Sequence, residues 1–567
     1  MLLSNLNLLA EAPGGVARLR ELILTLAVQG KLVPQDAKDE PASEFLKKIR
    51  VEKDRLIAGG KIKRDKPLAE IDDSEKPFGL PKGWEWVRLA NAVLKITDGE
   101  HLSPPKADEG MPLLTAKDVT SRGVQFEGTQ YVSCENGLKY RQRCDPARGD
   151  VLICSRGTIG RCAAVETDET FCLMGSVILL KVSEQSSYRY LLAYLTTGLA
   201  QTWMRGVTSA TAVSALYLKD VARCLIPVPP LTEQSRIVTR VEELMRLCDA
   251  LEAKGQLEAT QHAQLVTTLL ATLTDSETPA QLTENWQRIA THFDLLLDRP
   301  EAVNALEQTI LQLAVRGLLV AQDPQDEPAS ELIKKIRAEK DKLIADGKIK
   351  RDKPLPPIAE DEQPFALPVG WEWVRLGEIV LISSGVTLGR KTAIDSPVLL
   401  PYLRVANVQR WHLNLASMKE LVIDTSELER FQLVKGDLLI TEGGDWDKVG
   451  RTAIWRDELP TCVHQNHVFK VRGTSGQWNP VWAEMYLNSA IARAYFASSA
   501  KQTTNLASIN MTQLKDCAFP VPPLAEQSRI VTRVAQLRRL CTDLRQRLTA
   551  SQSTQAHLAE ALVENVA

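Results

Sequence analysis

The chain contains two copies of one sequence unit, and this internal repeat constrains its fold more than any other feature. Residues 19–89 match residues 306–376 at a constant offset of 287 without a gap, and 49 of the 71 positions are identical. Residues 224–252 match residues 517–545 at an offset of 293, with 20 of 29 positions identical. Repetition on this scale predicts a molecule built from two similar halves.

The segments between the matching regions differ and share only scattered patterns, such as GDVLI (149–153) and GDLLI (436–440). We therefore predict a shared frame in each half that surrounds a private insert, and the two inserts recognise different things. The predicted boundaries are a helical region at 1–83, a first insert at 84–223, a central helical region at 224–370, a second insert at 371–516 and a final helix at 517–567.

The frame predicts two long helices. The PVPP runs at 227–230 and 520–523 indicate extended backbone that leads into a helix, because proline fixes φ and suits a first helical turn. From Leu231 to Leu273 such a helix would reach ~64 Å, which exceeds one DNA turn of ~34 Å. Residues 19–33 and 306–320 predict further helices that end near Gly30 and Gly317 and pack against the long ones.

Apolar residues recur along both long helices at alternating spacings of four and three, which is the heptad pattern of a helix packed along another helix. They are Ile237, Val241, Leu244, Cys248 and Leu251 in the first copy and Ile530, Val534, Leu537, Cys541 and Leu544 in the second. We expect these two seams to pair with each other as antiparallel helices. An ordinary amphipathic helix on a globular core is the alternative.

The charged runs KKIRVEKDRL (47–56) and KIKRDKPL (61–68) permit two interpretations. One is a nucleic-acid contact, and the other is a solvated, salt-bridged helix face followed by a basic connector. The overall charge favours neither, since the formal net charge is -2. Each insert holds 16 Lys+Arg and 15 Asp+Glu, so a basic surface there must come from arrangement rather than excess.

The elements PVPPL-[TA]-EQSRIVTRV, DEPAS…KKIR and GWEWVRL, each present twice, resemble the specificity subunits of type I restriction–modification systems. The resemblance implies two α/β (α+β) target recognition domains separated by long antiparallel coiled-coil helices, in a pseudo-two-fold arrangement. It also implies a split, asymmetric target in double-stranded DNA, with one half read by each insert. Two methyltransferase subunits and the restriction subunits are the implied partners.

Candidate DNA contacts lie in two loops of the first insert and three of the second, where side chains able to bond base edges or phosphates gather. In the first insert they are Thr115, Lys117, Asp118 and Arg122, then Ser155, Arg156, Thr158 and Arg161. In the second insert they are Arg404, Asn407, Gln409 and Arg410, then Glu442, Asp445, Trp446, Lys448 and Arg451, and finally Thr504 and Asn505. Solvent-facing loop residues, hairpin turns or helix caps are the alternative in each case.

No catalytic motif is found. The chain contains no phosphate-binding G-x-x-x-x-G-K-[ST] loop and no [DN]-P-P-[FY] methylation tetrapeptide. Ten cysteines without a C-x-x-C pair indicate reduced thiols in a core rather than a metal site, and His464 and His467 are expected to be neutral and packed near a strand. We predict a non-catalytic chain that binds no metal or cofactor, with S-adenosylmethionine, ATP and Mg on the partner subunits.

No run of apolar residues is long enough to span a bilayer, and the N-terminus has no positive flank, so we expect a cytoplasmic protein without a membrane partner. Three alternatives to the main interpretation stay open. They are a coiled-coil scaffold that binds only proteins, an enzyme with an unrecognised site, and the specificity subunit of a methyltransferase-only system.

Overall fold

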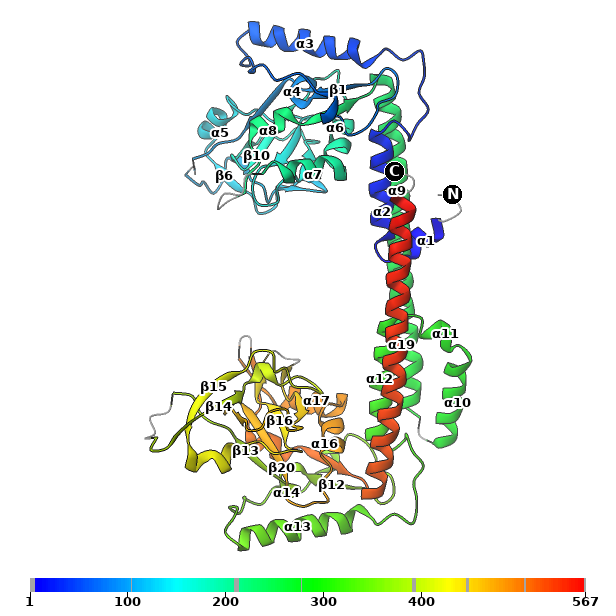
Figure 1. Ribbon diagram of the computed structural model, residues 1–567, viewed down its shortest axis with the longest axis vertical. Coiled ribbons are helices and arrows are strands. Elements are labelled where there is room, and N and C mark those ends of the chain that lie inside the picture. The colour runs from blue at the N-terminus through cyan, green and yellow to red at the C-terminus, as the bar shows by residue number, and fades with distance from the viewer. Residues whose placement is uncertain are drawn as a thin grey trace. The chain divides into compact units, whose positions relative to one another are not determined.

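The computed structural model describes residues 6–102, 105–208, 214–276, 278–389, 394–444, 448–503 and 506–564 (Figure 1). The chain forms two compact units, residues 1–258 with 552–567 and residues 259–551. Helix α9 (Leu231–Thr274) passes from the first unit into the second, and α19 (Leu524–Glu564) passes the opposite way. These helices contain 44 and 41 residues, as the proline-led seams predict. No helix in the described ranges carries an apolar stretch that could cross a membrane.

Each unit contains a reading domain, which is our name for its sheets and the short helices that cover them, and the two reading domains have the same sheet order despite their different sequences. The first has a four-stranded antiparallel sheet in the order β2-β10-β7-β8, and the second has β13-β20-β16-β18. A three-stranded sheet accompanies each, in the orders β6-β3-β9 and β15-β14-β19, with one parallel pair in both. The predicted mixed α/β inserts are therefore confirmed.

The strands of the first reading domain are β2 (Lys95–Asp98), β3 (Met111–Leu114), β4 (Val119–Thr120), β5 (Gly123–Val124), β6 (Gln130–Val132), β7 (Val151–Cys154), β8 (Cys162–Ala164), β9 (Cys172–Leu173) and β10 (Val177–Lys181). Its helices are α4 (Leu89–Ala92), α5 (Cys134–Arg141), α6 (Tyr188–Leu195), α7 (Gly198–Gly206) and α8 (Leu218–Arg223).

The strands of the second reading domain are β13 (Val380–Ser384), β14 (Pro397–Leu403), β15 (Lys419–Asp424), β16 (Leu438–Thr441), β17 (Gly443–Gly444), β18 (Thr452–Ile454), β19 (Val463–His464), β20 (Val468–Gly473), β21 (Lys501–Thr503) and β22 (Leu506–Ser508). Its helices are α14 (Leu376–Ile379), α15 (Leu428–Phe431), α16 (Pro480–Leu487), α17 (Ala490–Ser499) and α18 (Met511–Asp516). The two domains differ most near their loops, where the first pairs β4 with β5 and the second forms the sheet β17-β22-β21.

The frame closes each reading domain at its base. Strand β1 (Glu85–Arg88) pairs with β11 (Leu225–Val228), and β12 (Glu372–Arg375) pairs with β23 (Ala518–Val521) in the same register. The GWEWVRL and PVPP elements of each copy therefore lie side by side, although more than 130 residues separate them in the sequence. A long helix follows directly, so the proline runs mark where the reading domain ends and the helix begins.

The remaining frame helices are α1 (Leu6–Glu11), α2 (Gly15–Val28), α3 (Ala42–Ala58), α10 (Pro279–Thr291), α11 (Phe293–Leu296), α12 (Pro300–Val315) and α13 (Ala329–Ala345). Helices α2 and α12 end just before Gly30 and Gly317, as predicted. Both glycines have φ near +70°, the left-handed conformation that glycine adopts readily at a helix end.

The two long helices pack together in the second unit as predicted, where Val266, Leu270 and Leu273 of α9 share a core with the seam of α19, but the seam residues named for α9 face a different helix. Ile237, Val241 and Cys248 of α9 pack on α2 in the first unit, and Ile530, Val534 and Cys541 of α19 share a core with α12 in the second. Helix α2 presents a second face, where Leu22 and Leu26 meet the end of α19. A heptad pattern identifies a face that packs on a helix but not which helix, and the frame helix of the same copy provides the partner.

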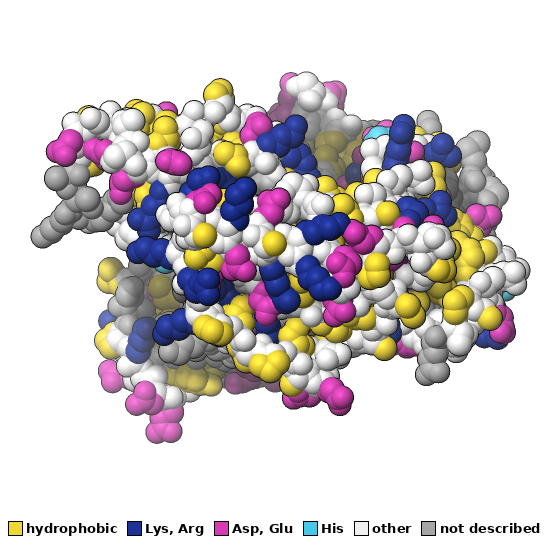
Figure 2. Space-filling model, turned by 90° about the horizontal axis from the view of Figure 1, so that it is seen from below, with side chains coloured by type: hydrophobic (Ala, Val, Ile, Leu, Met, Phe, Trp, Pro, Cys, Tyr) yellow, Lys and Arg dark blue, Asp and Glu magenta, His cyan; other side chains and the backbone are white. Residues whose placement is uncertain are grey.

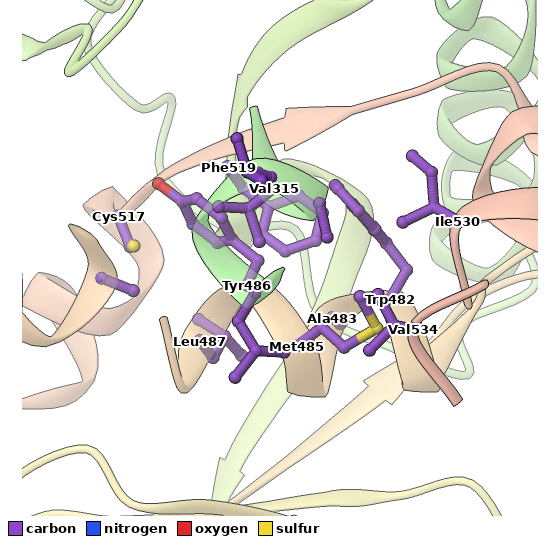
Figure 3. Packing of buried hydrophobic residues seen from close by; sticks show 14 of the residues in the cluster. Val315, Trp482, Ala483, Met485, Tyr486, Leu487, Cys517, Phe519, Ile530 and Val534 are labelled. Carbon is purple, nitrogen blue, oxygen red and sulfur yellow. The ribbon is translucent and has the colours of Figure 1, made fainter. Parts of the chain in front are cut away.

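Aromatic side chains join each reading domain to its base (Figure 3). In the second unit the indole of Trp482 donates to Pro520 O (3.0 Å) and the Tyr486 hydroxyl donates to Ala518 O (2.8 Å). The first unit repeats this with Tyr190 and Tyr194, which donate to Pro227 O and Leu225 O. The same carbonyls are satisfied in both copies, although one aromatic residue differs.

A buried carboxyl group on α16 gives a pH-dependent stability. Glu484 is 3% exposed, accepts from Ile454 N (3.0 Å) and lies 3.4 Å from the guanidinium of Arg456. Burial raises the pKa of Glu484 to about 6. The folded state therefore holds this proton more tightly than the unfolded state, and the contribution of Glu484 to stability decreases as the pH rises from about 4.5 to about 6.

Glu484→Gln removes this titration while keeping a carbonyl for Ile454 N. We expect the free energy of unfolding of the variant, relative to the parent, to increase by about 2 kcal/mol between pH 4 and pH 7. Urea unfolding across this pH range measures the difference. A constant difference between the two proteins would show that Glu484 does not titrate in this window.

Candidate nucleic-acid interface

Two of the predicted contact residues instead hold their own loops. Asp118 is 4% exposed, and its carboxylate accepts from the backbone and hydroxyl of Thr115 (2.8 and 2.9 Å). Asn407 is 2% exposed, and its side-chain oxygen accepts from Arg404 N (2.9 Å). Both are acceptors three residues after the backbone N–H that they bind, so they shape a turn and are not available to a base edge.

Ser155 is also unavailable, since it is 4% exposed and its hydroxyl donates to Gly175 O (3.2 Å). These three residues correct the prediction, which read short polar side chains near glycines as contacts. The T-x-x-D spacing of Thr115 and Asp118 was a signal for a local turn.

Equivalent arginines join the two predicted loops in each reading domain. Arg161 donates to Ala116 O (3.0 Å) and to the Thr158 hydroxyl (2.5 Å). Arg451 donates to Val405 O (3.4 Å) and to the Gln409 side chain (2.6 Å). Each arginine follows the glycine that closes the β7–β8 or β16–β18 hairpin. The structure thus brings together loops that lie about 40 residues apart in the sequence.

The glycines before these arginines are required by the packing. Gly160 and Gly450 have φ of +83° and +67°. A Cβ atom would lie 2.9 Å from the Gln201 side chain at the first position and 2.4 Å from the Phe496 ring at the second. The hairpin interpretation of these turns is therefore correct, and the hairpin is also what presents the arginine.

In the first reading domain the joined loops line a cleft of about 560 Å³. Arg122, Thr158 and Arg161 face it, with Ser121 and Gln201 beside them. Lys117 and Arg156 are exposed on the same two loops. The cleft combines cationic and neutral hydrogen-bonding groups, which are the groups that bind phosphate oxygens and base edges, with one carboxylate, Glu166, that pairs with Arg189 (3.0 Å).

In the second reading domain the corresponding side chains are half-buried and already engaged. The guanidinium of Arg404 donates to Ser417 O (2.8 Å), and that of Arg410 lies 3.4 Å from Asn488 Oδ1. Glu442 pairs with His467 (2.7 Å), and Lys448 is half-buried nearby. The predicted contacts Asp445, Trp446, Thr504 and Asn505 lie outside the described residues.

The two histidines differ from each other. His464 is buried, its Nδ1 lies 2.7 Å from Val468 O, and burial lowers its pKa to about 3, so it is neutral as predicted. His467 is exposed beside Glu442 and was not expected there. Within the described ranges, no three His, Cys, Asp or Glu side chains are grouped to hold a metal ion.

Trp411 is a feature of this interface that the sequence did not reveal. Its φ is +71°, which is unusual for a bulky residue. Its ring lies 4.4 Å from the guanidinium of Arg538 on α19, and Arg538 pairs with Glu307 on α12 (2.7 Å). The loop that carries Gln409 and Arg410 is thus held against the frame helices of its own unit.

Comparison with known proteins adds independent findings. A family model described as the type I restriction modification DNA specificity domain matches residues 81–261 and again residues 368–551. The EcoAI specificity subunit of Escherichia coli is 37% identical over 97% of this chain and 93% of its own length. The EcoEI specificity subunit of Escherichia coli is 35% identical over the same shares.

A solved structure described as showing complex assembly and conformational transition of the type I R-M system aligns with a TM-score of 0.47 at 18% identity. That alignment covers 86% of this chain and 99% of the other. The duplicated family match and the full-length likeness to the Escherichia coli proteins coincide with the two reading domains. The chain therefore belongs to the family of type I restriction–modification specificity subunits.

Proposed function

We propose that this chain reads a split, asymmetric target in double-stranded DNA, with residues 84–223 reading one half and residues 371–516 the other. The observation that carries the proposal is that two reading domains of identical sheet order present different side chains from equivalent loops. The side chains proposed to touch DNA are the exposed or half-buried ones: Thr115, Lys117, Arg122, Arg156, Thr158, Arg161, Arg404, Gln409, Arg410, Glu442 and Lys448.

The chain acts by positioning its partners. Two methyltransferase subunits, and through them restriction subunits, would dock on the helical frame and bring S-adenosylmethionine, ATP and Mg with them. An apolar cleft of about 430 Å³ in the second unit supports docking there. Trp286, Leu537 and Leu540 line it, and Trp286 and Leu540 are 43% and 64% exposed, so part of this apolar lining is accessible at the surface.

Mapping adenine methylation across the genome of the source cell, with and without the gene for this chain, tests the function. We expect a two-part motif with a fixed spacer that disappears on deletion. Methylation that persists unchanged, or a single undivided motif, would contradict the proposal. Restriction of incoming DNA in the same strains separates a complete system from one with methyltransferase alone.

Arg161→Ala and Arg451→Ala test the joined loops, and each half of the target serves as the control for the other. We expect Arg161→Ala to weaken discrimination of the half read by residues 84–223 by about tenfold or more, because a charged hydrogen bond contributes about 1.5–3 kcal/mol. Discrimination of the other half should stay the same. Arg451→Ala should instead weaken discrimination of the half read by residues 371–516 and leave the other half unchanged. Binding to duplexes altered in one half at a time measures both effects. Equal losses on both halves would count against separate readers.

A further inference from the structure

Each copy carries a short basic segment between its frame helix α3 or α13 and its reading domain. We call residues 61–66 and 348–353 the basic straps, and both have the sequence KIKRDK. All four cations of each strap are exposed. Each strap has one carboxylate, and it pairs with lysines outside the strap: Asp65 with Lys53 (2.7 Å), and Asp352 with Lys515 (2.5 Å) and Lys340 (3.6 Å). The four cations of each strap are therefore not neutralised by the strap's own carboxylate.

The strap cations have few acidic neighbours. Within the described part of the chain, none of the four cations in 61–66 lies within ion-pair distance of a carboxylate, and in 348–353 only Lys348 does, at 3.6 Å from Asp346. The preceding helices differ in this respect. Lys47 and Lys48 of α3 pair with Glu44 and Glu40, which fits the solvated, salt-bridged face considered for the helix.

Comparison of the two copies separates the demands of packing from those of charge. Buried or half-buried positions of α3 and α13 differ, with Phe45 and Leu46 in the first copy and Leu332 and Ile333 in the second. All nine cations from 47 to 66 are matched by cations from 334 to 353. If packing alone constrained this segment, the buried positions would be the same in both copies and the exposed cations would differ. The cations themselves therefore meet a requirement that is common to both halves.

The straps lie next to the reading domains. Lys53 of α3 donates to Ala90 O (2.8 Å) and Val93 O (3.3 Å), and Lys340 of α13 donates to Gly377 O (2.6 Å) and Val380 O (3.2 Å). These two lysines fix α3 and α13, the helices that lead into the straps, to the start of each reading domain. Figure 2 views the end of the molecule where α13 lies, and Lys and Arg side chains gather on that face among scattered carboxylates.

We propose that the basic straps bind the phosphates of the duplex held by the adjoining reading domain, as a DNA contact independent of base sequence. The partner must offer the same chemistry to both copies although the bases read differ, and the sugar–phosphate backbone does so. The reading domains have almost no net charge, and the exposed strap cations add positive charge for phosphate binding next to them. This inference rests on the proposed function.

The test uses the full chain and a duplex of random sequence about three helical turns long. Replacing Lys61, Lys63, Arg64 and Lys66 with glutamine should weaken binding about tenfold at ~0.15 M salt, and should reduce the slope of log affinity against log salt by about 2 or more. Affinity for the target duplex should decrease by the same factor, so the specificity ratio stays unchanged. Replacing each of these three lysines with arginine, and the arginine with lysine, keeps the charge and should preserve binding.

Glutamine at Arg240, Arg246 and Lys254, which are exposed on α9, provides a charge-changing control that should have little effect. Unchanged affinity and salt slope in the strap variant would overturn the inference, as would a changed specificity ratio. Normal DNA binding with loss of the methyltransferase from the purified complex would also overturn it and indicate an acidic protein surface. A parent chain that shows no preference for its target would instead contradict the proposed function.

Discussion

Trp482→Ala is expected to lower the free energy of unfolding of the second unit by about 3–5 kcal/mol. Trp482 is 1% exposed, its indole donates to Pro520 O, and its ring lies edge-on to Trp371 at 5.5 Å (Figure 3). Removing it leaves a cavity where the reading domain meets the start of α19 and takes away the only side-chain donor to that carbonyl among the described residues.

Chemical denaturation followed by fluorescence and circular dichroism measures this loss. Since the first unit is untouched, we expect an earlier transition that involves only part of the signal. Trp286→Ala is the matched control, because Trp286 is 43% exposed, and it should cost less than about 1 kcal/mol. Equal losses for the two variants would mean that the Trp482 cluster does not determine the stability of this unit.

Glu526→Ala is expected to cost about 2–4 kcal/mol, because the buried indole of Trp371 and the side-chain amide of Gln322 both lose their acceptor. The Glu526 carboxylate is 1% exposed and accepts from the Trp371 indole (3.0 Å) and the Gln322 side chain (2.7 Å). Burial raises the pKa of Glu526, and these two hydrogen bonds oppose that change. Glu526 lies in the first turn of α19, Trp371 directly precedes β12 and Gln322 lies in the loop after α12, so together they fix the reading domain on its helix.

The first copy contains the same arrangement and provides a matched control. Glu233 accepts from Trp84 (3.0 Å) and Gln35 (3.1 Å). Glu526→Ala should weaken recognition of the half-target read by residues 371–516, and Glu233→Ala should weaken the other half. The conservative Glu526→Gln change retains one acceptor and should lose less in both assays. Unfolding midpoints and half-site discrimination are measured on the same preparations, and a Glu526→Ala variant with parental values would contradict this account.

The frame was predictable because its signals are local. Proline fixes φ, so the PVPP runs predicted the extended strands and the starts of α9 and α19. Glycines at helix ends and heptad spacing act within a few turns, so the positions of α2 and α12 followed from the residues alone. The partner of the heptad face did not follow, since any apolar helix of suitable length could satisfy it.

The reading domains were less predictable because their side chains act across long distances in the sequence. Asp118 and Asn407 have the side chains of base-reading residues, but burial assigns them to turns. Arg161 and Arg451 were identified as candidates, yet their role of joining two loops depends on backbone carbonyls about 45 residues away. Trp411 occupies a left-handed position beside an arginine of α19, which no local pattern indicates.

The sequence by itself determined that this protein has two equivalent halves and where the long helices start, because repetition and backbone restrictions are properties of neighbouring residues. Only the tertiary structure decided which helix covers each heptad face, which polar side chains remain exposed, and which lysines the strap carboxylates pair with. Those outcomes depend on which groups folding removes from water, and that competition is settled among residues far apart in the chain.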